Sequence, residues 1–293
     1  MPADLFNDLP FRGSSYLITD ILEQLATYIG KDQTTSAAAF SDWLSKTGRT
    51  AIKKYPNHVA VRKHVTNLVY YVKRIVKSDS DVKEVKKKTL ARIKELKETI
   101  SDARERISEA GAKIILNQNK ILTISYSSVV KDILLTANRV KRKFTVYCAE
   151  SSPLNEGTRF AEDLATAGIQ CILIKDAAVM RTLPEMNLVI TGADRISTEN
   201  YINKIGTHIL ALGATSFKVP FYVAAETDKI LKETEFAVRF YPENPKEVYS
   251  GKSRQLKGEN YYFESIPLEY VSKIICEDGI FDTQEFMKWY LEE

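Results

Sequence analysis

Polar side chains of several chemical types gather in one stretch of the chain, between apolar segments at 186–192 and 219–225. They comprise an acid, an amide, two cations and a hydroxyl, namely Asp194, Asn203, Arg195, Lys204 and Thr207. A helix that begins near Asn-Lys-Ile-Gly-Thr would also present free backbone N–H groups and a positive dipole end to an anion. These groups predict a binding site for a phosphorylated ligand. An ion pair with Arg195 or Lys204 is the alternative role for Asp194.

Two further polar clusters follow apolar segments. Ser125, Ser127 and Ser128 come after the segment 121–124, and Glu150 begins the sequence Glu-Ser-Ser-Pro after the segment 144–149. The hydroxyl of Ser127 or Ser128 is suited either to cap the following helix or to hold a phosphate. The crevice at the carboxyl ends of the strands binds ligands in open α/β sheets, so we expect the three clusters to line it.

The pattern of apolar residues in the chain that positions these clusters changes near residue 120. Short apolar segments at 120–125, 143–149, 169–175, 186–192 and 219–225 predict strands, and the segments 128–142, 156–168, 177–184 and 204–217 between them predict helices. This alternation predicts a Rossmann-like, mostly parallel, doubly wound sheet with helices on both faces. The segment 241–263 is rich in proline and charge and is expected to be an excursion or a partner-facing loop, followed by a last strand or turn and a closing helix.

The first part of the chain has helical periodicity instead. Apolar residues recur at three- or four-residue spacing over 17–29, 36–55, 58–76 and the charge-dense segment 81–115. We therefore expect an α/β protein in which a helical domain, 1–113, ends in a long linker helix. It is followed by a ligand-binding and dimerisation domain, 114–293.

Composition excludes several classes of protein. The chain has 293 residues and a net charge of +4, with its basic residues interspersed among acidic ones, so direct nucleic-acid binding is not expected. No basic leader followed by an apolar stretch and no apolar run long enough to span a membrane is visible, which favours a cytoplasmic protein. Cys148 and Cys171 fall in strand-like segments, as expected of buried, reduced thiols. The three histidines lack metal-ligand spacing and the GxSxG, GxxxxGK[ST] and GxGxxG motifs are absent, so neither a metal nor a cofactor is predicted.

The central segments resemble a known family. The sequences GADRI at 192–196, NKIGT at 203–207 and PFYVAAET at 220–227 are similar to those of the family that unites the α, β and δ subunits of translation initiation factor 2B with two sugar-phosphate isomerases. Those isomerases act on ribose-1,5-bisphosphate and methylthioribose-1-phosphate. The amino-terminal FRGSS resembles the element that touches the substrate phosphate in the isomerases. The resemblance implies a ligand pocket lined by Arg12, Gly13, Ser14, Ser127, Glu150, Asp194, Asn203 and Lys204.

Departures from the family pattern bear on catalysis. The isomerases carry a cysteine that acts with the aspartate of GAD as an acid–base pair, and Ser125 stands at the position of that cysteine while Asp194 is retained. A hydroxyl is a far weaker acid than a thiol, and no residue nearby in the sequence is an obvious base to activate it. Ser152 replaces the arginine of the family's E-S/T-R-P motif, which removes one phosphate partner.

Two functions are consistent with these residues. The first is a non-catalytic regulatory subunit like initiation factor 2B α, which binds a sugar phosphate or nucleotide monophosphate and acts in translation initiation. It would form a homodimer or a hexamer, with initiation factor 2 or sibling 2B subunits as partners. The second is an aldose–ketose isomerase similar to ribose-1,5-bisphosphate isomerase, in which Asp194 is the acid and Ser125 or a water replaces the thiol. The missing thiol favours the regulatory protein over the enzyme.

Overall fold

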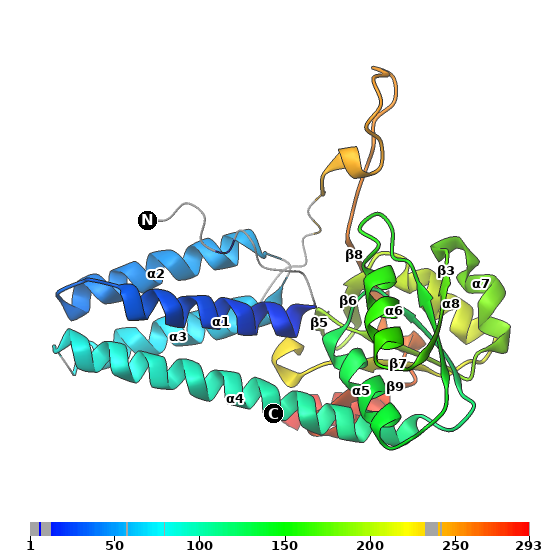
Figure 1. Cartoon of the computed structure of the whole chain (residues 1–293), viewed down its shortest axis with the longest axis horizontal. Helices are drawn as coiled ribbons and strands as arrows, with labels where there is room; N and C mark the ends of the chain where they lie inside the picture. Colours follow the sequence, from blue (N-terminus) through cyan, green and yellow to red (C-terminus); the bar gives the residue numbers. More distant parts are fainter. Residues whose placement is uncertain are drawn as a thin grey trace. The chain divides into compact units, whose positions relative to one another are not determined.

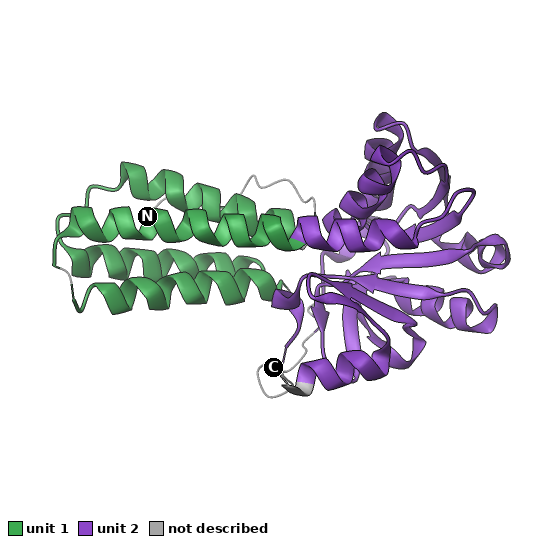
Figure 2. Cartoon of the chain, turned by 90° about the horizontal axis from the view of Figure 1, so that it is seen from below, with its two compact units in different colours: residues 1–103 green, residues 104–293 purple. Residues whose placement is uncertain are grey.

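The computed structural model describes residues 6, 13–56, 58–78, 80–231, 240 and 242–292, without the side chains of residues 14, 291 and 292. The chain divides into two compact units, Met1–Ala103 and Arg104–Glu293 (Figure 2). The helix α4 (Val82–Ile114) contributes residues to both.

The first unit is built from helices. They are α1 (Ser14–Lys31), α2 (Ala37–Lys54), α3 (Val59–Ile75) and the first part of α4, and all four segments predicted to be helical are confirmed. The helix α2 begins at a serine cap, because Ser36 accepts a hydrogen bond from the backbone N–H of Ala39. The apolar stripes pack on one another around fully buried residues such as Leu22, Phe40 and Leu68.

The second unit is a sheet with helices on both sides (Figure 1). Within the described residues the sheet has seven strands, in the order β10-β9-β7-β4-β1-β2-β3. Their bounds are β1 (Lys120–Ile124), β2 (Thr145–Ala149), β3 (Gln170–Ile174), β4 (Leu188–Gly192), β7 (Phe221–Ala224), β9 (Lys273–Cys276) and β10 (Gly279–Phe281). All neighbouring pairs are parallel except β9 and β10. The prediction of a mostly parallel, doubly wound sheet is confirmed.

Alternate residues of the strands supply two separate cores. Ile121 packs on one face with α5 (Ser128–Arg139), α6 (Glu156–Thr166) and the end of α4. Leu122 points to the opposite face, which is covered by α7 (Val179–Thr182), α8 (Thr207–Ser216) and α9 (Thr283–Glu292). This period of two is the pattern expected of strands that are buried on both faces. Short 3₁₀ turns lie at Asp176–Ala178, Leu183–Glu185, Thr227–Lys229, Pro245–Glu247 and Leu268–Tyr270.

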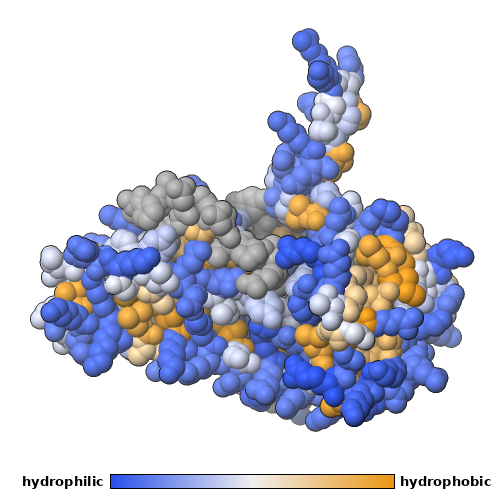
Figure 3. Space-filling model, in the orientation of Figure 1, coloured by the Kyte–Doolittle hydropathy of each residue, from blue (hydrophilic) through white to orange (hydrophobic). Residues whose placement is uncertain are grey.

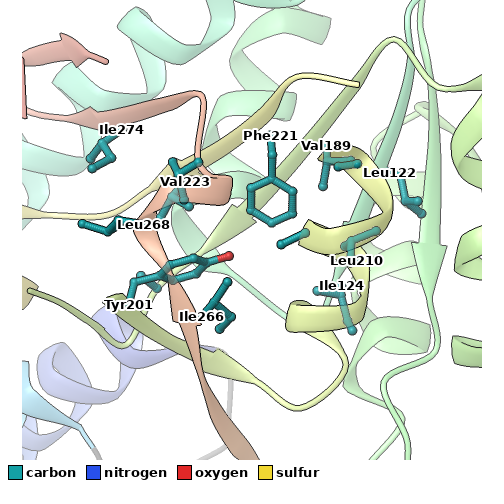
Figure 4. Packing of buried hydrophobic residues seen from close by; sticks show 14 of the residues in the cluster. Leu122, Ile124, Val189, Tyr201, Leu210, Phe221, Val223, Ile266, Leu268 and Ile274 are labelled. Atoms are coloured by element: carbon teal, nitrogen blue, oxygen red, sulfur yellow. The ribbon is translucent and has the colours of Figure 1, made fainter. Parts of the chain in front are cut away.

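A second, smaller sheet was not predicted. It consists of β5 (Arg195–Ile196), β6 (Asn200–Lys204) and β8 (Phe263–Pro267), paired antiparallel in the order β5-β6-β8. The predicted helix 204–217 is therefore wrong at its start, since β6 extends to Lys204 and α8 begins at Thr207. The fully buried Tyr201 joins this sheet to the main core, where its ring lies 6.5 Å from that of Phe221 (Figure 4). This packing fixes the strand that carries Asn203 and Lys204.

The surface of the second unit has an extended excursion and exposed apolar side chains. Residues 242–262 leave the small sheet as a long loop, orange in Figure 1. Apolar residues gather on the face of the unit seen in Figure 3. Large exposed apolar side chains occur on β3 (Ile172 and Leu173) and on α8 (Ile209 and Leu212). Within the described residues, no helix is both long and apolar enough to cross a membrane.

The cysteines are free thiols, and one of them departs from the prediction. Cys148 is buried as expected, whereas Cys171 is only half-buried. The reason is topological, because β3 is the edge strand of the sheet.

Candidate functional site

The polar clusters of the sequence meet at one edge of the main sheet. β1, β2, β4 and β7 are parallel neighbours, so Ser125, Glu150, Asp194 and Glu226 all follow the carboxyl ends of adjacent strands. Successive strands are added on one side of β1 up to β3, and the next strand, β4, lies on the other side of β1. Such a reversal is a topological switch point, the place where open α/β sheets bind ligands.

Ser125 lies at the centre of this edge and contacts a buried ion pair. Its hydroxyl donates a hydrogen bond to Glu156 Oε1 at 3.1 Å, and Lys204 Nζ lies 2.9 Å from the same oxygen. The side chains of Glu156 and Lys204 are only 6% and 4% exposed. Since burying a charge is costly unless it is paired, the two ions depend on each other.

The backbone of Ser125 is held in an uncommon conformation. Its φ of 69° lies in the left-handed region, and its N–H donates to Ser151 Oγ at 2.7 Å. The Ser151 hydroxyl in turn donates to the carbonyl of Ala149 at 3.2 Å, which ties the end of β1 to the end of β2. Such conformations persist where the surroundings fix them, and they cluster at functional sites.

Ser127 caps the helix α5. Its hydroxyl accepts a hydrogen bond from the backbone N–H of Val130 at 3.3 Å, so the capping alternative is realised. The same hydroxyl packs closely on the end of β4, because a Cβ placed on Gly192 would lie 2.5 Å from it. Glycine at position 192 therefore lets the two strands of the switch point approach each other at their ends.

The turn after β2 already has an anion in it. The carboxylate of Asp176 accepts hydrogen bonds from the backbone N–H groups of Ser151 at 2.8 Å and Ser152 at 2.7 Å. Glu150 forms an ion pair with the exposed Lys175 at 2.6 Å. A phosphate at this turn would have to compete with Asp176 for the same donors, since backbone N–H groups are the turn's anion-binding groups.

A second buried ion pair follows β7, beside Asp194. Lys229 Nζ lies 3.0 Å from Glu226 Oε2, and both side chains are almost fully buried. Burial alone would lower the pKa of Lys229, but the carboxylates of Glu226, Asp194 and Asp228 together raise it. Asp194 thus lies in the electrostatic field of Lys229, whereas Lys204 pairs with Glu156. Arg195 is buried on β5, and within the described part of the chain it forms no ion pair.

Asn203 and Thr207 fix the start of α8. Asn203 Nδ2 donates to Thr207 Oγ1 at 3.0 Å, and the Thr207 hydroxyl donates to the carbonyl of Lys204 at 2.6 Å. The ring of Tyr262 lies on the other side of Lys204, with its centroid 4.8 Å from Nζ, at the distance of a cation–π contact. Burial and a hydrogen bond to Glu247 raise the pKa of Tyr262.

The amino-terminal residues of the expected pocket belong to the first unit. Gly13 precedes α1 with a φ of 91°, and Ser14 is the first residue of that helix. Arg12 lies outside the described residues. A role for these three residues in ligand binding stays a prediction.

The structure also brings residues to the site that the sequence did not single out by role. Glu156 and Ser151 contact Ser125, and Asp176 binds the backbone of the turn after β2. Lys229 pairs with Glu226 after β7. The types and spacing of these residues in the sequence gave no sign of these contacts. The expectation that Ser125 has no base nearby holds in sequence only, because the carboxylate of Glu156 contacts its hydroxyl. Among the described residues, no group of three or more histidine, cysteine or acidic side chains could hold a metal ion.

Known proteins match the chain along most of its length. It is 29% identical to ribose 1,5-bisphosphate isomerase of Methanocaldococcus jannaschii over 291 residues, which is 98% of this chain and 91% of that protein. A Pyrococcus horikoshii protein named as a translation initiation factor eIF-2B subunit 2-like is 36% identical over 185 residues, 62% of this chain and 64% of that protein. The crystal structure of a Pyrococcus horikoshii translation initiation factor eIF-2B superposes with a TM-score of 0.77 and 26% identity, covering 96% of this chain and 97% of that one.

Residues 11–283 match the Initiation factor 2 subunit family, which spans both units. The chain belongs to the Initiation factor 2 subunit family.

Proposed function

We propose that this protein is a sugar-phosphate isomerase that converts an aldose 1-phosphate to the corresponding ketose phosphate. The observation that carries the proposal is the contact between the Ser125 hydroxyl and the buried carboxylate of Glu156. Ser125 stands where the isomerases carry their cysteine. The missing thiol, with no base nearby in the sequence to activate the serine, was the reason to favour a non-catalytic protein. Similarity to ribose 1,5-bisphosphate isomerase over nearly the whole chain supports the same function.

In this function the residues that follow the two strands of the switch point supply the proton donor and the proton acceptor of the reaction. Asp194, after β4, would donate a proton to the ring oxygen of the sugar, and Ser125, after β1, would accept one from the other end of the reacting bond. Asn203 and Lys204 would bind the sugar phosphate, with Ser127 and Glu150 as further contacts. Fixing a substrate between such groups supplies much of the rate enhancement of an enzyme.

The test is direct turnover. Purified protein is incubated with ribose-1,5-bisphosphate and, separately, with methylthioribose-1-phosphate, and the ketose is followed by phosphorus NMR. We expect conversion of one of them and a decrease in kcat of about 100-fold or more for Asp194→Asn, the usual effect of losing a general acid. Asp278→Asn is the matched control, because Asp278 pairs with Arg106 at the surface. If neither substrate is converted, the proposal is wrong.

A regulatory subunit of the initiation factor 2B type is the second candidate. Serine in place of the cysteine of the isomerases favours it, as does the similarity to an initiation factor subunit 2-like protein. Its partners would be initiation factor 2 or sibling subunits. Absence of turnover, together with a rise in melting temperature on addition of AMP or a sugar phosphate, would support it, because a ligand that binds only the native state stabilises it.

In either function we propose that the protein is a homodimer held together by the sheet unit. The exposed side chains of Ile209 and Leu212 on α8 support this proposal, because large apolar side chains grouped at a surface mark interaction sites. Replacing both by lysine should convert the dimer to a monomer, measured by sedimentation. Further pairing of dimers into hexamers would appear as a second, heavier species in the same measurement.

A further inference from the structure

We propose that Glu156 is the proton acceptor that acts through Ser125, so that a serine–glutamate pair does the work of the thiol in this chain. The inference rests on the proposed isomerase function and assigns the base that this function needs.

The hydrogen bonds of Glu156 fit this role. Oε1 accepts a bond from the Ser125 hydroxyl at 3.1 Å and lies 2.9 Å from Lys204 Nζ. Oε2 is buried and accepts no hydrogen bond from any residue that the structure describes. The Ser125 hydroxyl donates its hydrogen bond to Oε1, so Oε1 is the oxygen that takes this proton, and the unbonded Oε2 leaves the carboxylate with free lone-pair sites. Buried polar atoms are rarely left without a partner, and a catalytic role is one of the explanations for those that are.

The fold places this carboxylate with little freedom. Glu156 is the first residue of α6, and the following Gly157 donates its N–H to the carbonyl of Glu150 at 3.1 Å. A Cβ on Gly157 would lie 1.8 Å from the carbonyl oxygen of Ala149, so only glycine permits the start of α6 to lie this close to β2. The close approach brings Glu156 against the end of β1, where Ser125 is held by Ser151.

The proton transfer can be written as one balanced step. Asp194, protonated, gives its proton to the ring oxygen while the bond between C1 and that oxygen breaks. A hydride moves from C2 to C1, and the 2-hydroxyl becomes the ketone. The proton of the 2-hydroxyl passes to Ser125 Oγ while the hydroxyl proton of Ser125 passes to Glu156 Oε1. Asp194 ends as a carboxylate and Glu156 as a carboxylic acid, and exchange with water restores both.

Ser125 is the residue that touches the substrate in this step, and Glu156 acts behind it. A serine hydroxyl accepts this proton only if it loses its own in the same step, because a protonated alcohol is too strong an acid and an alkoxide too strong a base to form in water at neutral pH. A thiol needs no such partner, since a free cysteine has a pKa of about 8.5 and forms a thiolate near neutral pH. The two chemistries therefore predict different responses to the loss of Glu156.

The first experiment uses this difference. Glu156→Gln should lower kcat about 100-fold or more, as expected for the loss of a general base. The kcat of the double variant S125C/E156Q should be at least about tenfold higher than that of E156Q, and it should rise with pH as the thiol ionises. The surface carboxylate variant Glu185→Gln, which breaks the exposed pair with Lys120, should keep wild-type kcat.

If Glu156 only holds α6 or Lys204 in position, the double variant will be as inactive as E156Q and the proposal is overturned. Wild-type kcat in E156Q overturns it as well. If the wild-type protein shows no turnover, the proposed function is refuted. A second measurement then decides whether Glu156 acts on the residue at position 125.

That measurement is the rate at which iodoacetamide alkylates a thiol at position 125, in a C171S background that removes the half-buried native thiol. The carboxylate of Glu156 would raise the pKa of the introduced thiol, so S125C should react about 3–10 times more slowly than S125C/E156Q at pH near 7.5. Equal rates would mean that position 125 does not sense a charged Glu156, and would refute the pair irrespective of turnover.

Discussion

The stability of the sheet unit should depend strongly on Lys204. Its side chain is 4% exposed and lies 2.9 Å from the equally buried carboxylate of Glu156, whose other oxygen has no hydrogen bond within the described residues. Lys204→Met keeps the length of the apolar stem and removes the charge, so Glu156 is left ionised, buried and bonded only to Ser125. Breaking a buried ion pair in this way costs about 3–5 kcal/mol.

The assay can isolate the unit that contains the pair. The chain has two tryptophans, Trp43 on α2 and Trp289 on α9, one in each unit. Thermal unfolding in a W43F background, followed by tryptophan fluorescence, therefore reports on the second unit. The expected loss corresponds to a decrease in melting temperature of roughly 6–20 °C for a unit of this size.

Two comparisons sharpen the result. The double variant K204M/E156Q should recover most of the stability, because replacing both ions by neutral groups removes the uncompensated charge. Lys175→Met breaks the pair with Glu150, but Lys175 is 79% exposed, so we expect a loss below about 1 kcal/mol. A loss that small for K204M, or a double variant as unstable as K204M, would refute the view that these two charges require each other.

Three further outcomes follow from the site and its surroundings. Gly192→Ala should destabilise the sheet unit by about 1–3 kcal/mol in urea unfolding, because the Cβ of the alanine would lie 2.5 Å from Ser127 Oγ. An unchanged urea midpoint would contradict the close approach of the two strand ends. Cys171 should be the first native thiol to react with iodoacetamide, as identified by mass spectrometry. A hydrogen bond with Cys148 lowers the pKa of Cys171, whereas the same hydrogen bond and burial raise the pKa of Cys148. Modification of Cys148 before Cys171 would contradict this order. The raised pKa of Lys229 means that its contribution to stability is complete below its unfolded-state pKa of about 10.4 and is lost as pH rises through the higher folded-state value. Urea midpoints between pH 9 and 12 should therefore fall more steeply for wild type than for K229M, and parallel curves would refute the assignment.

Much of the architecture could be read from local pattern. The helices α1–α4 and the five parallel strands nearest the site follow from residue periodicity, since each element buries its apolar side chains at its own spacing. The polar residues after β1, β2 and β4 could also be assigned to one edge, because strands joined by helices run parallel and end together. The gathering of these polar side chains at the strand ends was therefore predictable.

The small sheet shows where local pattern fails. β6 ends at Lys204 and pairs with β8, in which Phe263 is the partner of Lys204. The two strands are separated by α8, β7 and the loop 242–262. A five-residue strand is defined by the partner it finds, and nothing within Asn200–Lys204 reveals a partner so far along the chain.

The sequence by itself determined which chemical groups are available: an aspartate at position 194, a serine at position 125, and a lysine in NKIGT. Only the tertiary structure decided how those groups are paired. It joins Ser125 to Glu156 and Glu156 to Lys204, and it fills the turn after β2 with the carboxylate of Asp176. The physical reason is that a buried charge must find its partner in space, whereas the chain can supply that partner from any position that the fold brings near.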